Sequence, residues 1–296
     1  MRNCVLTIGK FEGIHLGHQA LLTQVVRRAE SFKLASAAMV FEPHPYIFFG
    51  DTNYKPLFTK EERDHLLKIT GINYIFNCLF NEQFAALPPK DFCKKIFADY
   101  NAKFVIVGEN YRFGKDRMGD IKFLCREAAA YNAEVEVILP VGSGQCELIS
   151  TSTIRKLLSQ NNLPEANRQL GFPFFIMGIV TKGKQLGRTL NFPTINIYPT
   201  EEKFLPTDGV YATQTIISGE KFNGVTNIGL RPTVDNSGSV RSVETHLFNY
   251  TGDLYGQHIK TKLLEFIRPE RRFNSIDELK AQVAADALLA QKLMQS

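Results

Sequence analysis

Short apolar runs rich in β-forming residues alternate with helical patterns over the first half of the chain. The apolar runs lie at residues 4–8, 37–41, 74–80, 103–108 and 134–141. Helical periodicity separates and follows them, at residues 15–31, 59–70, 88–100, 119–131 and 151–160. Nearly continuous apolar strands that alternate with helices are typical of a parallel sheet covered on both faces. The pattern predicts an N-terminal α/β domain with a doubly wound parallel sheet.

The second half has a different pattern, in which turn-bounded strand candidates follow one another closely. They lie at residues 174–181, 192–198, 210–217, 224–230, 242–250 and 259–267. This spacing favours an antiparallel barrel or sandwich, of which we predict the barrel. A terminal helix begins after Ser275, with Glu278 in the capping-box position. An Asn-, Pro- and Gly-rich stretch separates the halves. The expected organisation is a domain at 1–158, a linker at 159–171 and a domain at 172–296.

Composition narrows the class of protein. The 296 residues carry a formal net charge of +5 without a run of five or six like charges, which argues against a nucleic-acid-binding stripe. No apolar stretch approaches the roughly 18 residues that a membrane span needs, and no signal-type segment opens the chain. The five cysteines are scattered without a C-x-x-C pair, as expected for free thiols. A cytoplasmic protein without membrane or nucleic-acid partners is predicted.

The loop after the first predicted strand carries two histidines among glycines, in the sequence GKFEGIHLGHQALL. Ligands of open α/β sheets collect at the carboxyl ends of the strands, and a helix N-terminus there favours phosphate. His15 and His18 could therefore hydrogen-bond phosphoryl oxygens. Two alternatives remain open at this point: the histidines could bind zinc, although a third ligand is not evident, or they could simply begin a helix.

A second polar segment, STSTIR, follows the last strand of the first half. Ser150, Thr151 and Ser152 offer hydroxyls and backbone amides at a predicted helix start, and Arg155 could bind phosphate with two N–H groups. A hydroxyl cluster before a helix can also be only an N-cap. Its place after the last strand, in a domain with H-L-G-H after the first, favours a phosphate site.

The second half carries its own candidates. Gly183, Gly187 and Arg188 belong to a flexible basic loop that could surround phosphates. Thr194 and Asn196, two apart on a predicted strand, would share a face and offer oxygen ligands for Mg²⁺. Glu244 lies in an alternating strand, where it could accept a proton from a hydroxyl or simply face solvent.

The N-terminal segments TIGKFEGIHLGHQ, VFEPHP, VIVGENYRFGKDRMGD and ISTSTIR resemble the FMN adenylyltransferase module of the bacterial bifunctional riboflavin kinase/FAD synthetase family. The resemblance implies that His15, His18 and Arg155 act on ATP phosphates. It also implies an ATP site formed by Gly9, Phe11, Gly17, Asn110, Ser150, Thr151 and Ser152. Pro43 and His44 are expected near the flavin. The family's usual G-N-F-D-G is changed here by Lys10 and Glu12.

The segments GRTLNFPTINI, GVYA, GVTNIGLRPTV, VETHLFNYTGDLYG and IRPERRFNSIDELKAQVAAD resemble the riboflavin kinase domain of the same family. By that resemblance Thr194 and Asn196 hold Mg²⁺ and ATP, beside the loop of Gly183, Gly187 and Arg188. Glu244 would be the base for the riboflavin 5′-hydroxyl. Asn191 stands where a glycine is usual.

The resemblance implies a two-step enzyme that converts riboflavin to FMN and FMN to FAD, with ATP as co-substrate in both steps and Mg²⁺ as cofactor. Its partners would be riboflavin, FMN, FAD and ATP. One alternative is a different H-x-G-H nucleotidyltransferase, which would not explain the segments FPTIN and VETHLF. Another is a flavin-binding or regulatory relative that has lost one activity. The oligomeric state is left open.

Overall fold

The computed structural model describes residues 2–139, 149–182, 192–232 and 239–295. The chain forms two compact units, residues 1–151 and 152–296. Among the described residues, no helix is long and apolar enough to cross a membrane.

The first unit is built on a five-stranded parallel sheet in the order β3-β2-β1-β4-β5. The strands are β1 (Cys4–Ile8), β2 (Ala35–Glu42), β3 (Tyr74–Leu79), β4 (Ala102–Gly108) and β5 (Glu134–Ile138). Every residue of β1 is buried, since the strand lies in the centre of the sheet with a neighbour on each side. The predicted parallel α/β domain is confirmed.

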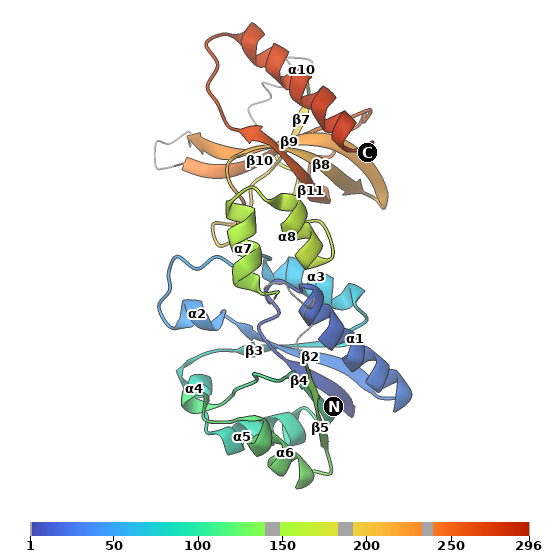
Figure 1. The fold of residues 1–296 in the computed structure, drawn as a ribbon, viewed down its shortest axis with the longest axis vertical. Helices are drawn as coiled ribbons and strands as arrows, with labels where there is room; N and C mark the ends of the chain where they lie inside the picture. The colour runs from blue at the N-terminus through green and yellow to red at the C-terminus, as the bar shows by residue number, and fades with distance from the viewer. Residues whose placement is uncertain (1, 140–148, 183–191, 233–238, 296) are drawn as a thin grey trace. The chain divides into compact units, whose positions relative to one another are not determined.

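Helices cover both faces of this sheet (Figure 1). One face carries α1 (Leu16–Ser31) and α3 (Lys60–Ile69), and the other carries α5 (Pro89–Lys94) and α6 (Ile121–Ala129). The longer connections also contain α2 (Pro45–Phe48), α4 (Glu82–Ala85), the short π-helix η1 (Lys95–Asp99) and the short 3₁₀ helix η2 (Lys115–Arg117). On the α5–α6 face, Leu6 and Val105 pack against Phe92, Ile96 and Leu124. The result is a doubly wound domain.

The second unit is a six-stranded antiparallel sheet in the order β6-β11-β8-β9-β10-β7. The strands are β6 (Phe175–Ile179), β7 (Thr194–Ile197), β8 (Gly209–Ile217), β9 (Glu220–Pro232), β10 (Ser239–Leu247) and β11 (His258–Pro269). The Thr181 amide donates to the Asn196 carbonyl at 2.9 Å, which joins the two edges of the sheet. The sheet therefore curls toward a barrel, as the strand spacing predicts.

The terminal helix α10 (Ile276–Leu293) packs on one face of this barrel, where Ala290 contacts Val210 and Val225. The Ser275 hydroxyl accepts a hydrogen bond from the Glu278 amide at 3.1 Å, as the capping pattern predicts. The terminal helix is confirmed.

The stretch expected to be a linker, residues 159–171, contains a helix. Helices α7 (Thr151–Ser159) and α8 (Leu163–Leu170) follow each other closely. Asn162 caps α8 through its side chain, and Gly171 ends it in the left-handed conformation. Asn, Pro and Gly are enriched at helix ends as well as in linkers, so composition alone did not separate the two.

Candidate active sites

The loop that carries the two histidines lies where the direction of the sheet's connections reverses. Strand β1 has β2 on one side and β4 on the other, and the loops after β1 and β4 leave the same edge of the sheet. In open α/β sheets this position leaves a crevice at the carboxyl ends of the strands. The fold thus brings Gly9 and Asn110, far apart in sequence, to one place.

The imidazoles of His15 and His18 are stacked, with ring centroids 3.9 Å apart and planes inclined by 20°. His15 is the N-cap residue of α1, but its side chain makes no capping hydrogen bond in the described structure. The Nδ1 atoms of both rings are buried without a hydrogen-bond partner among the described residues. Buried polar atoms are normally paired, so two unpaired ring nitrogens beside a cavity favour ligand binding over a purely structural role.

Burial controls the charge of this histidine pair. It lowers the pKa of His15 to about 4, and burial together with the nearby His15 lowers the pKa of His18 to about 3. Both rings are therefore neutral at pH 7, each with one N–H donor. The amides and the positive dipole end of the 16-residue helix α1 lie at the same place. The site can therefore hydrogen-bond an anion.

The backbone of the loop holds the histidines in position. Phe11 and Ile14 both have positive φ, 45° and 43°, although neither is a glycine. Such conformations cost energy and concentrate at functional sites. Gly17 has a different reason to be small, because a Cβ there would lie 3.3 Å from the His15 ring. The centroid of the Phe11 phenyl ring lies 5.3 Å from the centroid of the His18 imidazole.

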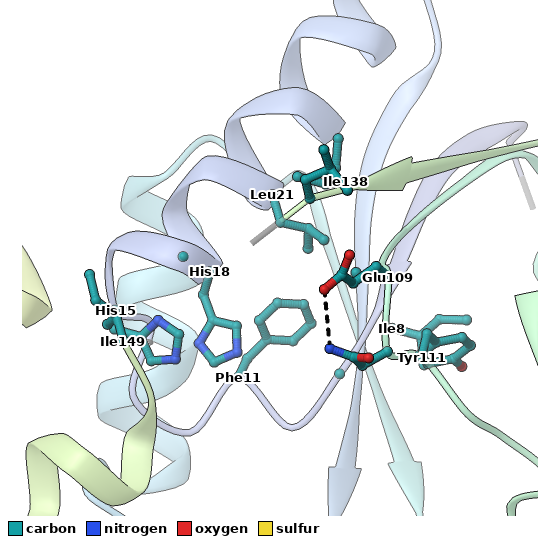
Figure 2. A pocket seen from close by; sticks show the side chains of 14 residues that line it. Ile8, Phe11, His15, His18, Leu21, Glu109, Tyr111, Ile138 and Ile149 are labelled. Atoms are coloured by element: carbon teal, nitrogen blue, oxygen red, sulfur yellow. Dashed lines mark hydrogen bonds between the residues drawn. The ribbon is translucent and has the colours of Figure 1, made fainter. Parts of the chain in front are cut away.

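Both histidines line a cavity of about 290 Å³ (Figure 2). Its other wall comes from the loop after β4, where the Asn110 amide donates to Glu109 at 3.5 Å. Ile149 also lines this cavity. Four of the predicted ATP-site residues, Gly9, Phe11, Gly17 and Asn110, are among the lining residues.

The STS segment lies partly beside this loop. A Cβ on Gly13 would lie 3.4 Å from the Thr151 hydroxyl, so Thr151 is adjacent to the histidine loop. Thr151 is the last residue of the first unit, whereas Ser152 and Arg155 belong to the second. In that unit the guanidinium of Arg155 lies 4.8 Å from the centre of the Phe204 ring. The phosphate-binding roles of Ser150, Ser152 and Arg155 stay predictions.

A second, larger cavity of about 740 Å³ adjoins the first and shares Ile8, Gly9, Asn110 and Tyr111 with it. Its walls are largely aromatic and include Phe41, Tyr46, Phe49, Phe80, Phe84, Phe92 and Phe113. An aromatic pocket of this size suits a flat ring system. Sequence reasoning missed this cavity, although 23 phenylalanines in a chain without tryptophan were a visible signal.

The two residues predicted near the flavin, Pro43 and His44, are not among those that line either cavity. The His44 ring stacks on Tyr54, with centroids 4.4 Å apart. Its Nδ1 atom accepts from the Tyr46 amide at 3.2 Å and so caps α2. His44 therefore holds the segment whose next residues, Pro45 and Tyr46, do line the aromatic cavity.

Glu12 connects that segment to the histidine loop. Its carboxylate is buried, accepts from the Leu57 amide at 3.0 Å, and accepts a short hydrogen bond from the Tyr54 hydroxyl. The His44 Nε2 atom lies 4.0 Å from the same carboxylate. Glu12 is thus a contact between two loops.

In the second unit, Asn196 of β7 pairs directly opposite Glu244 of β10, and Thr194 pairs opposite His246. Cross-strand partners share a face of the sheet, so the three predicted residues lie together. Glu244 accepts from the Ser242 hydroxyl at 3.2 Å.

Across the other edge of β10, Asn227 of β9 is paired opposite Glu244. Its amide donates to Glu270 at 3.0 Å. Asn227 and Glu270 were not predicted from the sequence. The alternation of side chains that places Glu244 on one face of β10 also places its cross-strand neighbour Asn227 on that face.

The oxygen atoms here fit a hard cation. Asn196 is only 4% exposed, and its Oδ1 atom has no hydrogen-bond partner in the described parts of the chain. A buried carbonyl oxygen without a donor, on the same face of the strand as the Thr194 hydroxyl, offers the type of oxygen ligand that Mg²⁺ prefers. The predicted phosphate loop, Gly183, Gly187 and Arg188, together with Asn191, lies outside the described residues.

The chain matches two family models, one for each half. The model described as FAD synthetase matches residues 1–153, and the model described as riboflavin kinase matches residues 170–294. The bifunctional riboflavin kinase/FMN adenylyltransferase of Escherichia coli (strain K12) is 39% identical over 98% of this chain and 92% of its own length. This chain belongs to the bifunctional riboflavin kinase/FMN adenylyltransferase family. The resemblance that the motifs indicated is confirmed.

Other matches extend over the same length. The family member of Bacillus subtilis (strain 168) is 36% identical over 95% of this chain and 90% of its own. A solved structure titled "Crystal Structure of Macrolide-efflux Protein from Streptococcus pneumoniae" superposes with a TM-score of 0.84 at 28% identity, over 98% of this chain and 94% of that one. The two halves therefore stand in the family's order, and the chain shares its fold with that solved structure over nearly its whole length.

Proposed function

We propose that the chain converts riboflavin to FAD in two steps at two sites. The barrel unit phosphorylates riboflavin from ATP, and the α/β unit joins the resulting FMN to the AMP moiety of a second ATP. One observation carries the assignment of the second step: two stacked, neutral histidines with unpaired buried nitrogens line a cavity that adjoins an aromatic one.

In adenylyl transfer, ATP occupies the histidine cavity and the isoalloxazine ring of FMN occupies the aromatic one. An oxygen of the FMN phosphate attacks the α-phosphorus of ATP, the bond to the bridging oxygen of the β-phosphate breaks, and pyrophosphate leaves. His15, His18 and the amides of α1 donate hydrogen bonds to phosphate oxygens as charge moves onto the leaving group. Catalysis comes from positioning and charge stabilisation.

In the kinase step, the riboflavin 5′-hydroxyl attacks the γ-phosphorus of ATP, the bond to the β–γ bridging oxygen breaks, and ADP leaves. Glu244 accepts the proton of the hydroxyl. Thr194 and Asn196 hold Mg²⁺, which neutralises phosphate charge when bound.

We place both reactions in the cytoplasm. The support is chemical: the cysteines of the described residues, Cys4, Cys78, Cys93 and Cys125, are all free thiols. Unpaired cysteines are usual in a reducing compartment.

The test is to incubate the protein with riboflavin, ATP and Mg²⁺ and to separate the flavin products. Detection of FAD supports both activities, and detection of FMN alone supports only the kinase. If the folded protein forms neither product, the proposal is wrong. His18→Ala should abolish FAD formation and leave FMN formation intact. Glu244→Gln should abolish phosphorylation of riboflavin, yet still convert supplied FMN to FAD. The division between sites fails if either variant, correctly folded, blocks both reactions.

A further inference from the structure

Lys10 lies in the loop between β1 and α1, immediately after Gly9. Its side chain is exposed and lines the aromatic cavity, with the Nζ atom 3.8 Å from the centre of the Tyr46 ring. No carboxylate within ion-pair distance of Lys10 is found among the described residues, so its charge is balanced there only by the face of an aromatic ring. A cation–π contact at an exposed site is weak, and a phosphate can readily take the place of the ring.

Lys10 lies near the junction of the two cavities, where its positive charge can contact a substrate phosphate. Gly9 and Asn110 line both cavities and so mark their junction. In adenylyl transfer, the attacking phosphate must lie in line with the α-phosphorus, with the flavin ring on one side and the nucleotide on the other. The FMN phosphate therefore has to lie at this junction, next to Lys10.

Two anions meet at this point, which opposes binding unless a cation offsets their repulsion. The neutral histidines do not supply a positive charge. Two other cations line the aromatic cavity, Arg112 and Arg117, and both belong to the loop after β4. Arg112 lies 3.7 Å from the carboxylate of Asp120, which partly neutralises it. Lys10 is the cation contributed by the histidine loop itself.

We propose that Lys10 makes the adenylyltransferase site selective for flavins that bear a phosphate monoester. Its ammonium leaves the Tyr46 ring and forms a charge-assisted hydrogen bond to the FMN phosphate. Riboflavin, which has the same ring system but no phosphate, gains nothing from Lys10. The protein acts on both riboflavin and FMN, so this contact favours FMN over riboflavin at the adenylyltransferase site. The inference rests on the proposed function.

The test compares Lys10→Asn with Lys10→Arg and with Lys122→Asn, which removes an exposed lysine on α6 that lines neither cavity. Every protein compared also carries Glu244→Gln, so that riboflavin is not phosphorylated during the assay. Adenylylation of FMN is measured at saturating ATP and Mg²⁺, and riboflavin is added as a competitive inhibitor. Lys10→Asn should raise the KM for FMN about 10-fold, the size expected for losing a hydrogen bond to a charged group, with kcat changed far less. The inhibition constant of riboflavin should stay unchanged.

Salt dependence gives a second measurement that a structural role would not alter. The KM for FMN should rise with ionic strength in the unmodified protein and in Lys10→Arg, but much less in Lys10→Asn. Lys122→Asn should behave as the unmodified protein. An unchanged KM in Lys10→Asn, or an equal rise in the constants for FMN and riboflavin, overturns the inference. If the unmodified protein makes no FAD from FMN, the proposed function itself fails instead.

Discussion

The buried histidine pair predicts a specific loss of stability in mild acid. Burial lowers the pKa of His15 to about 4, against about 6.5 for an imidazole in the unfolded chain. As the pH falls from 8 to 5, the unfolded state takes up a proton on this ring and the folded state does not. Stability must therefore fall with pH over this range.

The magnitude follows from the two pKa values. At pH 5 an unfolded imidazole is almost fully protonated, whereas folded His15 stays mostly neutral, which costs about 2 kcal/mol relative to pH 8. The pKa of His18 is lowered to about 3, but its ring partly faces the cavity, so water reduces its contribution. Together the two rings should cost the first unit about 2–4 kcal/mol.

Hydrogen exchange read by mass spectrometry measures this unit separately, through peptides from β1 and β4. The opening free energy at pH 8 and pH 5, corrected for intrinsic exchange, is compared between the unmodified protein and a variant with His15→Gln and His18→Gln. The variant should lack the extra loss of about 2–4 kcal/mol at pH 5. His258→Gln, which removes an exposed imidazole from the other unit, is the control. Equal pH dependence in the unmodified protein and the double variant would refute the reasoning.

Two further predictions concern buried carboxylates. Tyr54→Phe removes a donor from the buried Glu12 and should lower the stability of the first unit by about 1.5–3 kcal/mol, measured by the same exchange experiment. In the second unit, Asp286 on α10 accepts two N–H groups of Arg268, at 2.7 and 3.0 Å, and is 4% exposed. Asp286→Ala should destabilise that unit by about 3 kcal/mol in urea unfolding, because it leaves a half-buried guanidinium unpaired. Arg271→Ala breaks an exposed ion pair of the same helix and should cost less than about 1 kcal/mol.

The sheets could be predicted from the sequence because burial dictates their residues directly. Strand β1 coincides with the apolar run at 4–8, since a central strand of a doubly wound sheet is covered on both faces. The barrel strands followed from their spacing between turns. Short elements such as α2 and α4 did not follow, because one turn of helix is too short to show a period.

The candidate site could be located from sequence, but its shape could not. The glycines and histidines of the first loop indicated a phosphate site, and the position after the first strand indicated where it lies. The aromatic cavity depends on residues from β2, α2, α4 and α5, which only the fold brings together. His44 illustrates the difference: its motif suggested contact with a ligand, while its ring caps a helix turn and stacks on Tyr54.

Lys10 and Glu12, the two departures from the family's usual motif in this loop, have opposite surroundings. The carboxylate of Glu12 reaches Leu57 and Tyr54, so its charge is buried and bound within the protein. Lys10 is exposed, and its ammonium lies over the Tyr46 ring in a contact that a phosphate can replace. The change to Glu12 therefore stabilises the contact between two loops, whereas the change to Lys10 leaves a positive charge available to the substrate at the junction of the cavities.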